Sequence, residues 1–465
     1  MEKIIRIQRA EIKNLQNVRK GSIDFSKSKG SNANITGIYG QNGSGKTSFI
    51  RSIAMLRQLL SGAPLKAEYI GRMTAGQSVT TLDFEFLLRN GSFTRLIYKV
   101  YLEKTSDPLD LTEEKEAKEA LVVSREILSY STLQDDRWSP TEKILEYKKS
   151  SPAVILPKIR EKEFVGGKKN VLNEFQVTKG LASKLGTSFI FLKDTINVLN
   201  KHCKNHRFTG LITSLKEYAL RNLFVIENRD SGLINLNAGL PFSFKISEGS
   251  TFTMGTLIVA LNKPSTIPVR HFEIVNRLIS DMNRVLEKII PGLTIKLKEL
   301  GSQLIENGSM GVNVDLVSVR KDTEIPLRYE SDGIKKIISV LHMLIETYNN
   351  PSMTLAIDEL DSGIFEYMWG ELLQSFEQGG AGQLIYTSHN LRPMELLDKN
   401  SVVVSTANPN NRYIRLRNIK TNNNTKNVFL RDIVLDGQSE TIYEPTNIFD
   451  IKHAFRSLRQ NNHAS

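Results

Sequence analysis

Residues 35–47 read ITGIYGQNGSGKT and carry the strongest signal in the chain. The first five, Ile35–Tyr39, are mostly apolar, which favours a buried strand. The next eight match G-x-x-x-x-G-K-[ST], the pattern of a phosphate-binding loop. Apolar residues then recur at helical spacing from Phe49 to Leu60, and the Ser-Gly pair that follows is typical of a helix end. The sequence therefore predicts a strand, a loop and a helix in the order that phosphate binding requires.

The glycines of this loop let successive backbone N–H groups point inward at phosphate oxygens, and the dipole of the following helix adds to the attraction. Lys46 is expected to reach the β- and γ-phosphates of a nucleotide, and Thr47 to hold Mg²⁺ with its hydroxyl. A chance match in a glycine-rich turn is the alternative, and the flanking strand and helix argue against it. The candidate nucleotide-binding residues of the loop are Gly40, Asn42, Gly43, Ser44, Gly45, Lys46, Thr47 and Ser48.

Strand patterns follow this first unit. Residues 81–88 and 96–102 are predicted to be strands on either side of a turn at residues 89–91. Gln77 stands just before them. It could sense the γ-phosphate through Mg²⁺ or a water, or it could be an exposed polar residue of a loop, and the sequence leaves both interpretations open.

The middle of the chain has a different composition, with mixed charge from residue 105 onward. Helical patterns at Glu113–Tyr130 and Phe189–Leu223 predict a mainly helical insertion over residues 105–265. No heptad pattern is sustained there, although a long coiled-coil arm would require one. We therefore expect the insertion to separate two halves of one ATPase head, residues 1–104 and 266–465.

The C-terminal half begins with a helical pattern from Val275 to Ile289 and with strand patterns at residues 294–297 and 312–316. Ser331 and Gly333 then precede another helical pattern. Serine and glycine at a helix start offer a hydroxyl and free N–H groups to an anion, although helix caps without that role are far commoner.

Two further strands end in polar residues. Met353–Ile357 runs into Asp358 and Glu359, and residues 383–390 form a second apolar run whose polar end contains His389. Asp358 is expected to hold Mg²⁺ through a water, and Glu359 to polarise the water that attacks the γ-phosphate. His389 is expected to reach that phosphate or that water. The alternative is that these strands simply end in solvated polar residues, and the phosphate-binding loop in the same chain argues against it.

In this order the motifs resemble those of the ABC-type ATPases of the RecF/SMC class, over roughly residues 1–104 and 266–420. Residues 357–365, IDELDSGIF, look like the corresponding segment of the OLD-like and anti-phage defence ATPases. The resemblance implies an α/β fold, an ABC-type P-loop ATPase head. Such a head has a mixed sheet flanked by helices and an antiparallel β lobe, here with a largely helical insertion.

In that family two ATP molecules, each with Mg²⁺, lie between two heads. The resemblance therefore implies a homodimer or a higher oligomer, in which Ser331 of one copy contacts the γ-phosphate held by Lys46 of the other. The usual Leu-Ser-Gly-Gly signature is Glu-Ser-Asp-Gly at residues 330–333 here. The implied catalytic residues are Lys46, Glu359 and His389, the implied further ATP contacts are Gln77, Ser331 and Gly333, and the implied metal contacts are Thr47, Gln77 and Asp358.

Composition limits where the protein can act. Among 465 residues there are 62 Lys and Arg, 50 Asp and Glu, and a single cysteine, Cys203. A lone cysteine excludes a disulfide scaffold and fits a reducing cytoplasm. No apolar run reaches the roughly 18 residues that cross a bilayer, and the first residues are too charged for a signal peptide. We therefore expect a cytoplasmic protein with no membrane partner. The formal charge of +12 permits contact with nucleic acid, but it is spread along the chain.

Three functions fit these features. Resemblance to the Septu and PARIS ATPase subunits favours a sensor or switch of a prokaryotic anti-phage defence system that controls a separately encoded effector, a nuclease or a toxin. A RecF-like repair ATPase that binds duplex DNA is the alternative. An ATPase subunit of a transporter is the third, and the insertion and the altered signature argue against it. Only 76 residues follow His389, so we expect no nuclease domain in this chain. Residues 412–465 are predicted to form strands and a short helix at 451–458.

Overall fold

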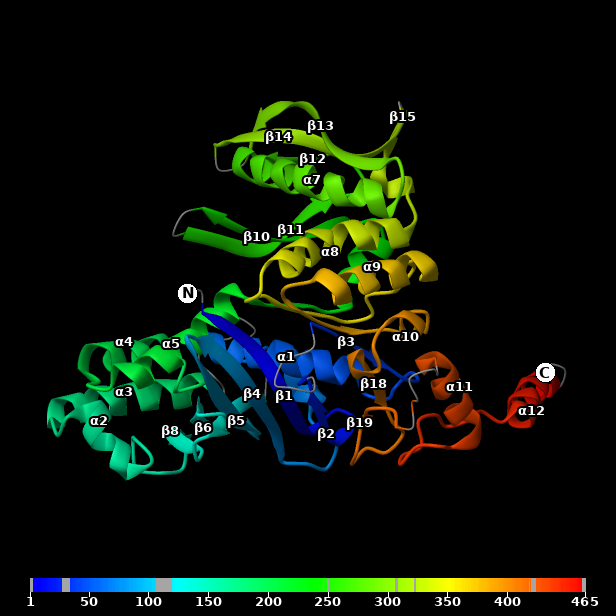
Figure 1. The fold of residues 1–465 in the computed structure, drawn as a ribbon. Coiled ribbons are helices and arrows are strands. Elements are labelled where there is room, and N and C mark those ends of the chain that lie inside the picture. The colour runs from blue at the N-terminus through cyan, green and yellow to red at the C-terminus, as the bar shows by residue number, and fades with distance from the viewer. Residues whose placement is uncertain are drawn as a thin grey trace.

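The computed structural model describes residues 3–26, 34–105, 119–248, 251–305, 308–321, 323–417, 419 and 424–461. A central sheet lies in the middle of the molecule, with an antiparallel lobe and α1 to one side and α8 and α9 to the other (Figure 1). A smaller layer built on α7 stands beyond α8 (Figure 1). Among the described residues, no helix has the length and apolar character needed to span a membrane.

Six described strands form the central sheet, in the order β19-β18-β3-β17-β16-β9. All neighbours in it are parallel except β19, which is antiparallel to β18. β3, β16 and β17 are buried along their whole length, as expected for parallel strands covered on both faces. The bounds are β3 Ile35–Tyr39, β9 Leu223–Ile226, β16 Thr354–Ile357, β17 Gln383–Thr387, β18 Val402–Ser405 and β19 Tyr413–Ile414.

Helices cover both faces of this sheet because its strands are apolar on both faces. α1, Lys46–Ser61, shares one core with Ile38 of β3 and Ile385 of β17. α8, Asp332–Asn349, and α9, Glu366–Gly379, share a second core with the side chains that point the opposite way from the same strands. The short helix α10, Pro393–Leu396, follows β17 and contacts α9.

The antiparallel lobe packs against α1. Its strands run in the order β2-β1-β4-β5-β6-β7, with β8 beside β6. Buried and partly exposed residues alternate along β4 and β5, so one face of the lobe joins the core of α1. The bounds are β1 Ile4–Leu15, β2 Val18–Asp24, β4 Val79–Asn90, β5 Ser92–Thr105, β6 Ala120–Gln134, β7 Arg137–Trp138 and β8 Glu142–Lys148.

The helix predicted at Glu113–Tyr130 is wrong where the structure describes it. Residues 120–134 form β6, which pairs with β5 on one side and β8 on the other. Residues 113–118 lie outside the described residues. The segment is rich in β-branched and aromatic residues, and pairing with two neighbouring strands outweighs its weak helical spacing.

The expectation of a mainly helical insertion at 105–265 is also wrong, because strands occur there as well as helices. β8 extends the lobe, β9 joins the central sheet, and β10, Gly239–Glu248, and β11, Thr251–Ala260, form a hairpin. The helix predicted at 189–223 is present as α4 and α5, which are separated at residues 203–205. The domain boundaries themselves stay a prediction. The helical bounds are α2 Glu161–Val165, α3 Lys169–Leu185, α4 Lys193–His202, α5 His206–Arg221 and α6 Arg229–Asn235.

The helix and strands predicted after residue 275 are confirmed and are longer than expected. α7 packs against β13, and β14 pairs with β12, β13 and β15. The helix predicted at residues 451–458 lies within α12, and β19 is the only strand among the described residues of 412–465. The bounds are α7 Val269–Ile289, β12 Ser265–Pro268, β13 Leu293–Leu304, β14 Met310–Arg320, β15 Thr323–Pro326, α11 Thr425–Leu435 and α12 Ile448–Asn461.

Candidate nucleotide-binding site

The predicted phosphate-binding loop joins β3 to the start of α1. Gly43 has a φ of 77° and Gly45 a φ of 93°, in the left-handed region that favours glycine. A Cβ on Gly40 would overlap Ser405 of β18. The Tyr413 hydroxyl donates a hydrogen bond to the Gly45 carbonyl at 2.7 Å. The loop therefore needs glycine where the motif has it, and the neighbouring strands β18 and β19 support it.

The side chain of Lys46 is held over this loop by backbone carbonyl groups of the loop itself. Its Nζ donates to the carbonyl oxygens of Gly40 at 2.8 Å and of Gln41 at 3.0 Å. Burial lowers the pKa of Lys46, while the carboxylates of Glu359 and Asp358 act in the opposite direction. A poorly solvated cation beside loop N–H groups is suited to an anionic ligand, because phosphate oxygens would replace the missing water.

Asp358 lies at the end of β16, and its side chain is buried. Its Oδ1 accepts hydrogen bonds from Thr47 Oγ1 at 3.2 Å and from Thr387 Oγ1 at 2.7 Å. These three residues meet because β3, β17 and β16 are adjacent and parallel, so their carboxyl ends lie at one edge of the sheet.

Two of these residues, Thr47 and Asp358, fit a Mg²⁺ ion. Mg²⁺ in phosphate-transfer sites takes one or two protein oxygens and completes its shell with phosphates and waters. The hydroxyl of Thr47 and the carboxylate of Asp358 supply such oxygens side by side. Among the described residues no cluster of three or more His, Cys, Asp and Glu side chains suited to a metal occurs.

Glu359 follows Asp358 in a left-handed conformation with a φ of 47°, which is uncommon for a residue other than glycine. Its backbone N–H donates to Thr387 Oγ1 at 2.7 Å. Its carboxylate accepts a hydrogen bond from Asn228 Nδ2. Asn228 reaches it because β9 runs beside β16, with Ile226 opposite Ile357. The Glu359 carboxylate thus has a fixed hydrogen-bond donor, Asn228, from the middle of the chain.

A cavity of about 420 Å³ opens above the loop and brings most of the predicted residues together. It contains the loop, the proposed base Glu359 and His389. Ser44 lies behind the loop, where its hydroxyl contacts that of Ser405. The lining residues are Gln16, Asn17, Asn42, Gly43, Gly45, Lys46, Thr47, Ser48, Arg51, Glu359 and His389.

His389 stands at the polar end of β17, where its exposed side chain lines the cavity. Its backbone N–H donates to Asp361 Oδ2 at 3.0 Å, and the N–H of Asn390 donates to the same oxygen at 2.7 Å. The loop after Glu359 therefore fixes the turn that presents His389 to the cavity.

Three polar residues that line the cavity were not predicted from the sequence: Gln16, Asn17 and Arg51. Gln16 Oε1 accepts from Ser48 Oγ at 2.8 Å and from Arg51 at 3.1 Å, and Asn17 Nδ2 donates to the Gly43 carbonyl. Gln16 and Asn17 form the turn between β1 and β2, far from the loop in sequence. A turn with two amides is the only local signal, and it is weak.

Gln77 is not brought into the cavity. Its side chain is exposed, and its backbone N–H donates to the Thr74 carbonyl at 3.1 Å. The Thr74 hydroxyl in turn donates to the Gln16 carbonyl at 2.7 Å. The segment that contains Gln77 thus supports Gln16, and the glutamine side chain that lines the cavity is that of Gln16.

Ser331 and Gly333 also lie outside the cavity of the same chain. Ser331 caps α8 by accepting a hydrogen bond from the Ile334 N–H at 3.4 Å, and its side chain is exposed. A Cβ on Gly333 would overlap the Gly363 carbonyl. The start of α8 therefore presses against the loop that follows Glu359 and leaves Ser331 free to face another molecule.

Comparison with known proteins agrees with this geometry. A family model described as "AAA ATPase domain" matches residues 6–392, which include every predicted site residue. The solved Smc head bound to the C-winged helix domain of ScpA is 12% identical, with a TM-score of 0.40 over 88% of this chain and 97% of that chain. The SMC head domain from Thermotoga maritima is 15% identical, with a TM-score of 0.35 over 89% and 99%. The recombination mediator protein RecF-ATP of the RecFOR pathway is 11% identical, with a TM-score of 0.32 over 84% and 95%. A search of curated proteins gives no match.

The family match, together with the parallel sheet, the phosphate-binding loop and the antiparallel lobe, confirms the predicted fold class, an ABC-type P-loop ATPase head. It also confirms that the chain contains an ATPase domain.

Proposed function

The chain belongs to the AAA ATPase domain family, and from this premise we propose that it binds ATP with Mg²⁺ in the cavity above residues 40–47 and hydrolyses it. One observation carries the proposal. The buried Asp358 carboxylate accepts hydrogen bonds from Thr387 and from Thr47, and Thr47 lines the cavity together with Lys46 and Glu359. This arrangement supplies a phosphate cradle, oxygens for the metal and a base in one place.

Each residue has a role that follows from its position. Lys46 and the backbone N–H groups of the loop neutralise the β- and γ-phosphates. Thr47 and Asp358 hold Mg²⁺, which would draw charge from the phosphates when bound. Glu359 accepts a proton from the attacking water and orients it, and Asn228 fixes the direction of that carboxylate. His389, which lines the same cavity, contacts the γ-phosphate or the water.

We propose that the active form contains two heads. In one chain Ser331 is exposed and lies outside the cavity that contains Lys46. A second copy related by two-fold symmetry would place its Ser331 against the γ-phosphate, and the same contact would be repeated at the other site. Because each site needs residues of both copies, the rate of ATP hydrolysis would depend on how much of the protein has assembled into pairs.

For the biological role, we propose the sensor or switch of a prokaryotic anti-phage defence system that controls a separately encoded effector. Support comes from residues 357–365 and from the altered signature at residues 330–333, both of which resemble the defence ATPases. The exposed apolar side chains of α11 and α12 are suited to protein contacts.

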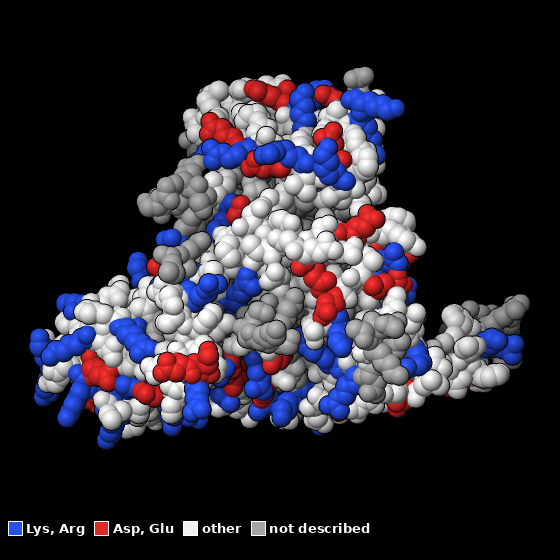
Figure 2. Space-filling view, in the orientation of Figure 1, with Lys and Arg blue, Asp and Glu red and all other residues white. Residues whose placement is uncertain are grey.

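A RecF-like repair ATPase is the alternative, because the net charge is +12 and Lys and Arg side chains are frequent along the lower edge of the molecule in Figure 2. Many Lys and Arg side chains of the described residues have acidic partners, as in the pairs Lys13–Glu11 at 3.0 Å and Lys99–Asp83 at 3.2 Å. This pairing reduces the charge that a phosphate backbone would meet, so we place the repair role second.

ATP hydrolysis by the purified chain, with and without duplex DNA, tests these proposals together with the mass in solution. We expect hydrolysis that is indifferent to DNA in a stable oligomer. Stimulation by DNA that weakens steeply with salt would favour the repair role instead. If the wild-type protein hydrolyses no ATP at saturating Mg²⁺ and ATP, the enzymatic proposal is contradicted.

A further inference from the structure

α12 carries an apolar stripe that the described residues leave uncovered. Ile448, Ile451 and Phe455 recur at helical spacing, and Phe449 flanks them. Phe449 is 81% exposed and Phe455 is 75% exposed. In Figure 1 this helix stands clear of the rest of the chain. An amphipathic helix with two open aromatic side chains is suited to a groove on another surface.

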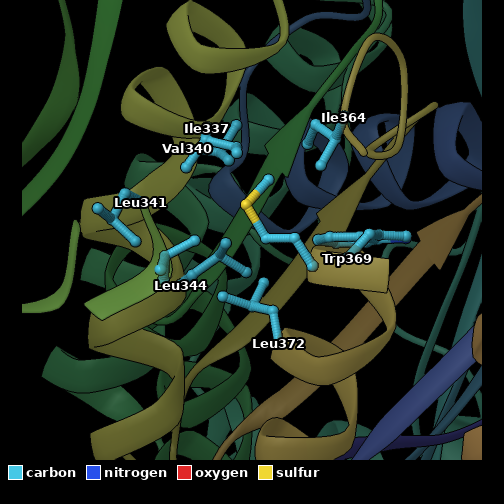
Figure 3. A pocket seen from close by; sticks show the side chains of 9 residues that line it. Ile337, Val340, Leu341, Leu344, Ile364, Trp369 and Leu372 are labelled. Atoms are coloured by element: carbon cyan, nitrogen blue, oxygen red, sulfur yellow. The ribbon is translucent and has the colours of Figure 1, made fainter. Parts of the chain in front are cut away.

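Such a groove lies at the junction of α7, α8 and α9. It has a volume of about 530 Å³, and its lining is mainly apolar. Figure 3 shows the pocket that adjoins it, where the side chains of Leu341 and Leu344 from α8 and of Leu372 from α9 are among those that line it. These three leucines line the groove as well.

Charge on the two elements is complementary. α9 has three glutamates and no lysine or arginine, and Glu371 lines the groove. α12 contains Lys452 and Arg456 against the single acid Asp450. The one basic residue of the groove is Lys288, which comes from α7. A basic helix laid beside α9 would therefore gain electrostatic attraction along with the burial of its apolar stripe.

We propose that α12 of one copy docks into the α7–α8–α9 groove of a second copy. The inference rests on the proposed two-headed assembly. The segment before α12 is fixed beside the phosphate-binding loop, where the Glu444 N–H donates to Gln41 Oε1 at 2.9 Å. In the proposed pair this loop faces Ser331 of the second copy, at the start of the α8 that lines the second copy's groove.

The lengths agree with this route. Leu344 stands 13 residues after Ser331 on α8, about 20 Å along the helix. The 14 residues of α12 extend about 21 Å, and three residues between Glu444 and the helix add about 10 Å. Within one chain, Figure 1 shows α12 and the α8–α9 pair well separated. Docking of α12 would thus connect the phosphate-binding loop of one copy to α8 of the other copy, the helix that begins at the altered signature.

Disulfide capture between differently tagged chains tests the docking. Cys203 is the only cysteine, so a Cys203→Ser background has none. One chain then receives Ala454→Cys on α12, which preserves the stripe and the charges, and the other receives Ser375→Cys at the groove. Under mild oxidation we expect a linked product that contains both tags. Ser92→Cys, at the exposed first residue of β5, is the matched control and should give none.

Replacing Phe449 and Phe455 with aspartate in the α12 chain should reduce the linked product at least about tenfold, because buried aromatic anchors dominate such contacts. These side chains are exposed within the chain, so the head should fold unchanged. Equal capture by the Ser92→Cys control, or an internal disulfide alone when one chain carries both cysteines, would overturn the docking in a second copy.

ATP hydrolysis measured on the wild-type protein distinguishes a failure of the docking proposal from a failure of the proposed function. A chain that hydrolyses ATP but yields no mixed product refutes the docking alone. A chain that yields the mixed product without hydrolysing ATP refutes the enzymatic proposal and supports the docking.

Discussion

Thr387→Val removes one hydroxyl from the centre of the site and leaves the shape of the side chain nearly unchanged. That hydroxyl donates to Asp358 Oδ1 at 2.7 Å and accepts from the Glu359 N–H at 2.7 Å. Thr387 is fully buried, so water cannot replace it. The variant should lose about 2 to 6 kcal/mol of stability, since a bond to a charged group and an unpaired N–H each cost about 1 to 3 kcal/mol.

The same hydroxyl sets the direction of the metal ligand and the base. Without it, Glu359 has less to hold its left-handed conformation, and both carboxylates are free to shift. A displacement near 1 Å costs about 10²-fold in rate, so the kcat for ATP should fall by that order while the KM changes less. A thermal melt should show a Tm lowered by roughly 2 to 6 °C, because the unfolding entropy of a chain this long makes 1 kcal/mol equivalent to about 1 °C.

Thr36→Val on β3 is the matched control. Thr36 is 1% exposed, and its hydroxyl has no hydrogen-bond partner among the described residues. The substitution makes the same chemical change in the same sheet and should leave stability and rate nearly unaltered or slightly improved. If Thr387→Val melts and hydrolyses ATP as Thr36→Val does, the assigned role of the Thr387 hydroxyl is refuted.

Three further predictions concern single residues. Lys46→Ala should abolish binding of a fluorescent ATP analogue, whereas Lys66→Ala, at a residue that does not line the cavity, should not; normal affinity in the first variant would contradict the loop assignment. Glu359→Gln should still bind ATP but hydrolyse it about 10² to 10⁴ times more slowly and accumulate as paired heads, and undiminished turnover would remove Glu359 as the base. Burial lowers the pKa of His342 from 6.5 to about 4, so the unfolded chain binds more protons between these pH values and stability should fall by about 3 kcal/mol as the pH drops from 6.5 to 4. Denaturation of His342→Leu over that range should show a flatter dependence, and equal slopes would count against the buried imidazole.

The parts of the site that the sequence predicted are those encoded locally. The phosphate-binding loop needs glycine at fixed positions, and Asp358, Glu359 and His389 each follow an apolar strand whose end is visible in the pattern. Parallel strands bring such ends to one edge, so the spacing of the motifs was enough to place them together.

The parts that were missed depend on chain segments distant from the loop. Gln16 enters the cavity from a turn of the lobe, and Asn228 reaches Glu359 only because β9 pairs with β16. No pattern in the sequence predicts that β9 pairs with β16. Gln77 was predicted as a possible γ-phosphate sensor from its place after the loop. In the structure, the segment that contains it supports Gln16 instead. The helix predicted over β6 failed for a similar reason, because two partner strands fix its conformation.

The central claim is that ATP is hydrolysed between two copies of this chain, and mixing two inactive variants tests it most directly. Lys46→Ala disables the phosphate loop of its own chain, and Ser331→Arg blocks the surface offered to a partner. We predict that each variant alone is inactive and that an equal mixture recovers about a quarter of the wild-type ATP hydrolysis rate, because half of the random pairs contain one intact site of two. A mixture no more active than its separate components would contradict the account.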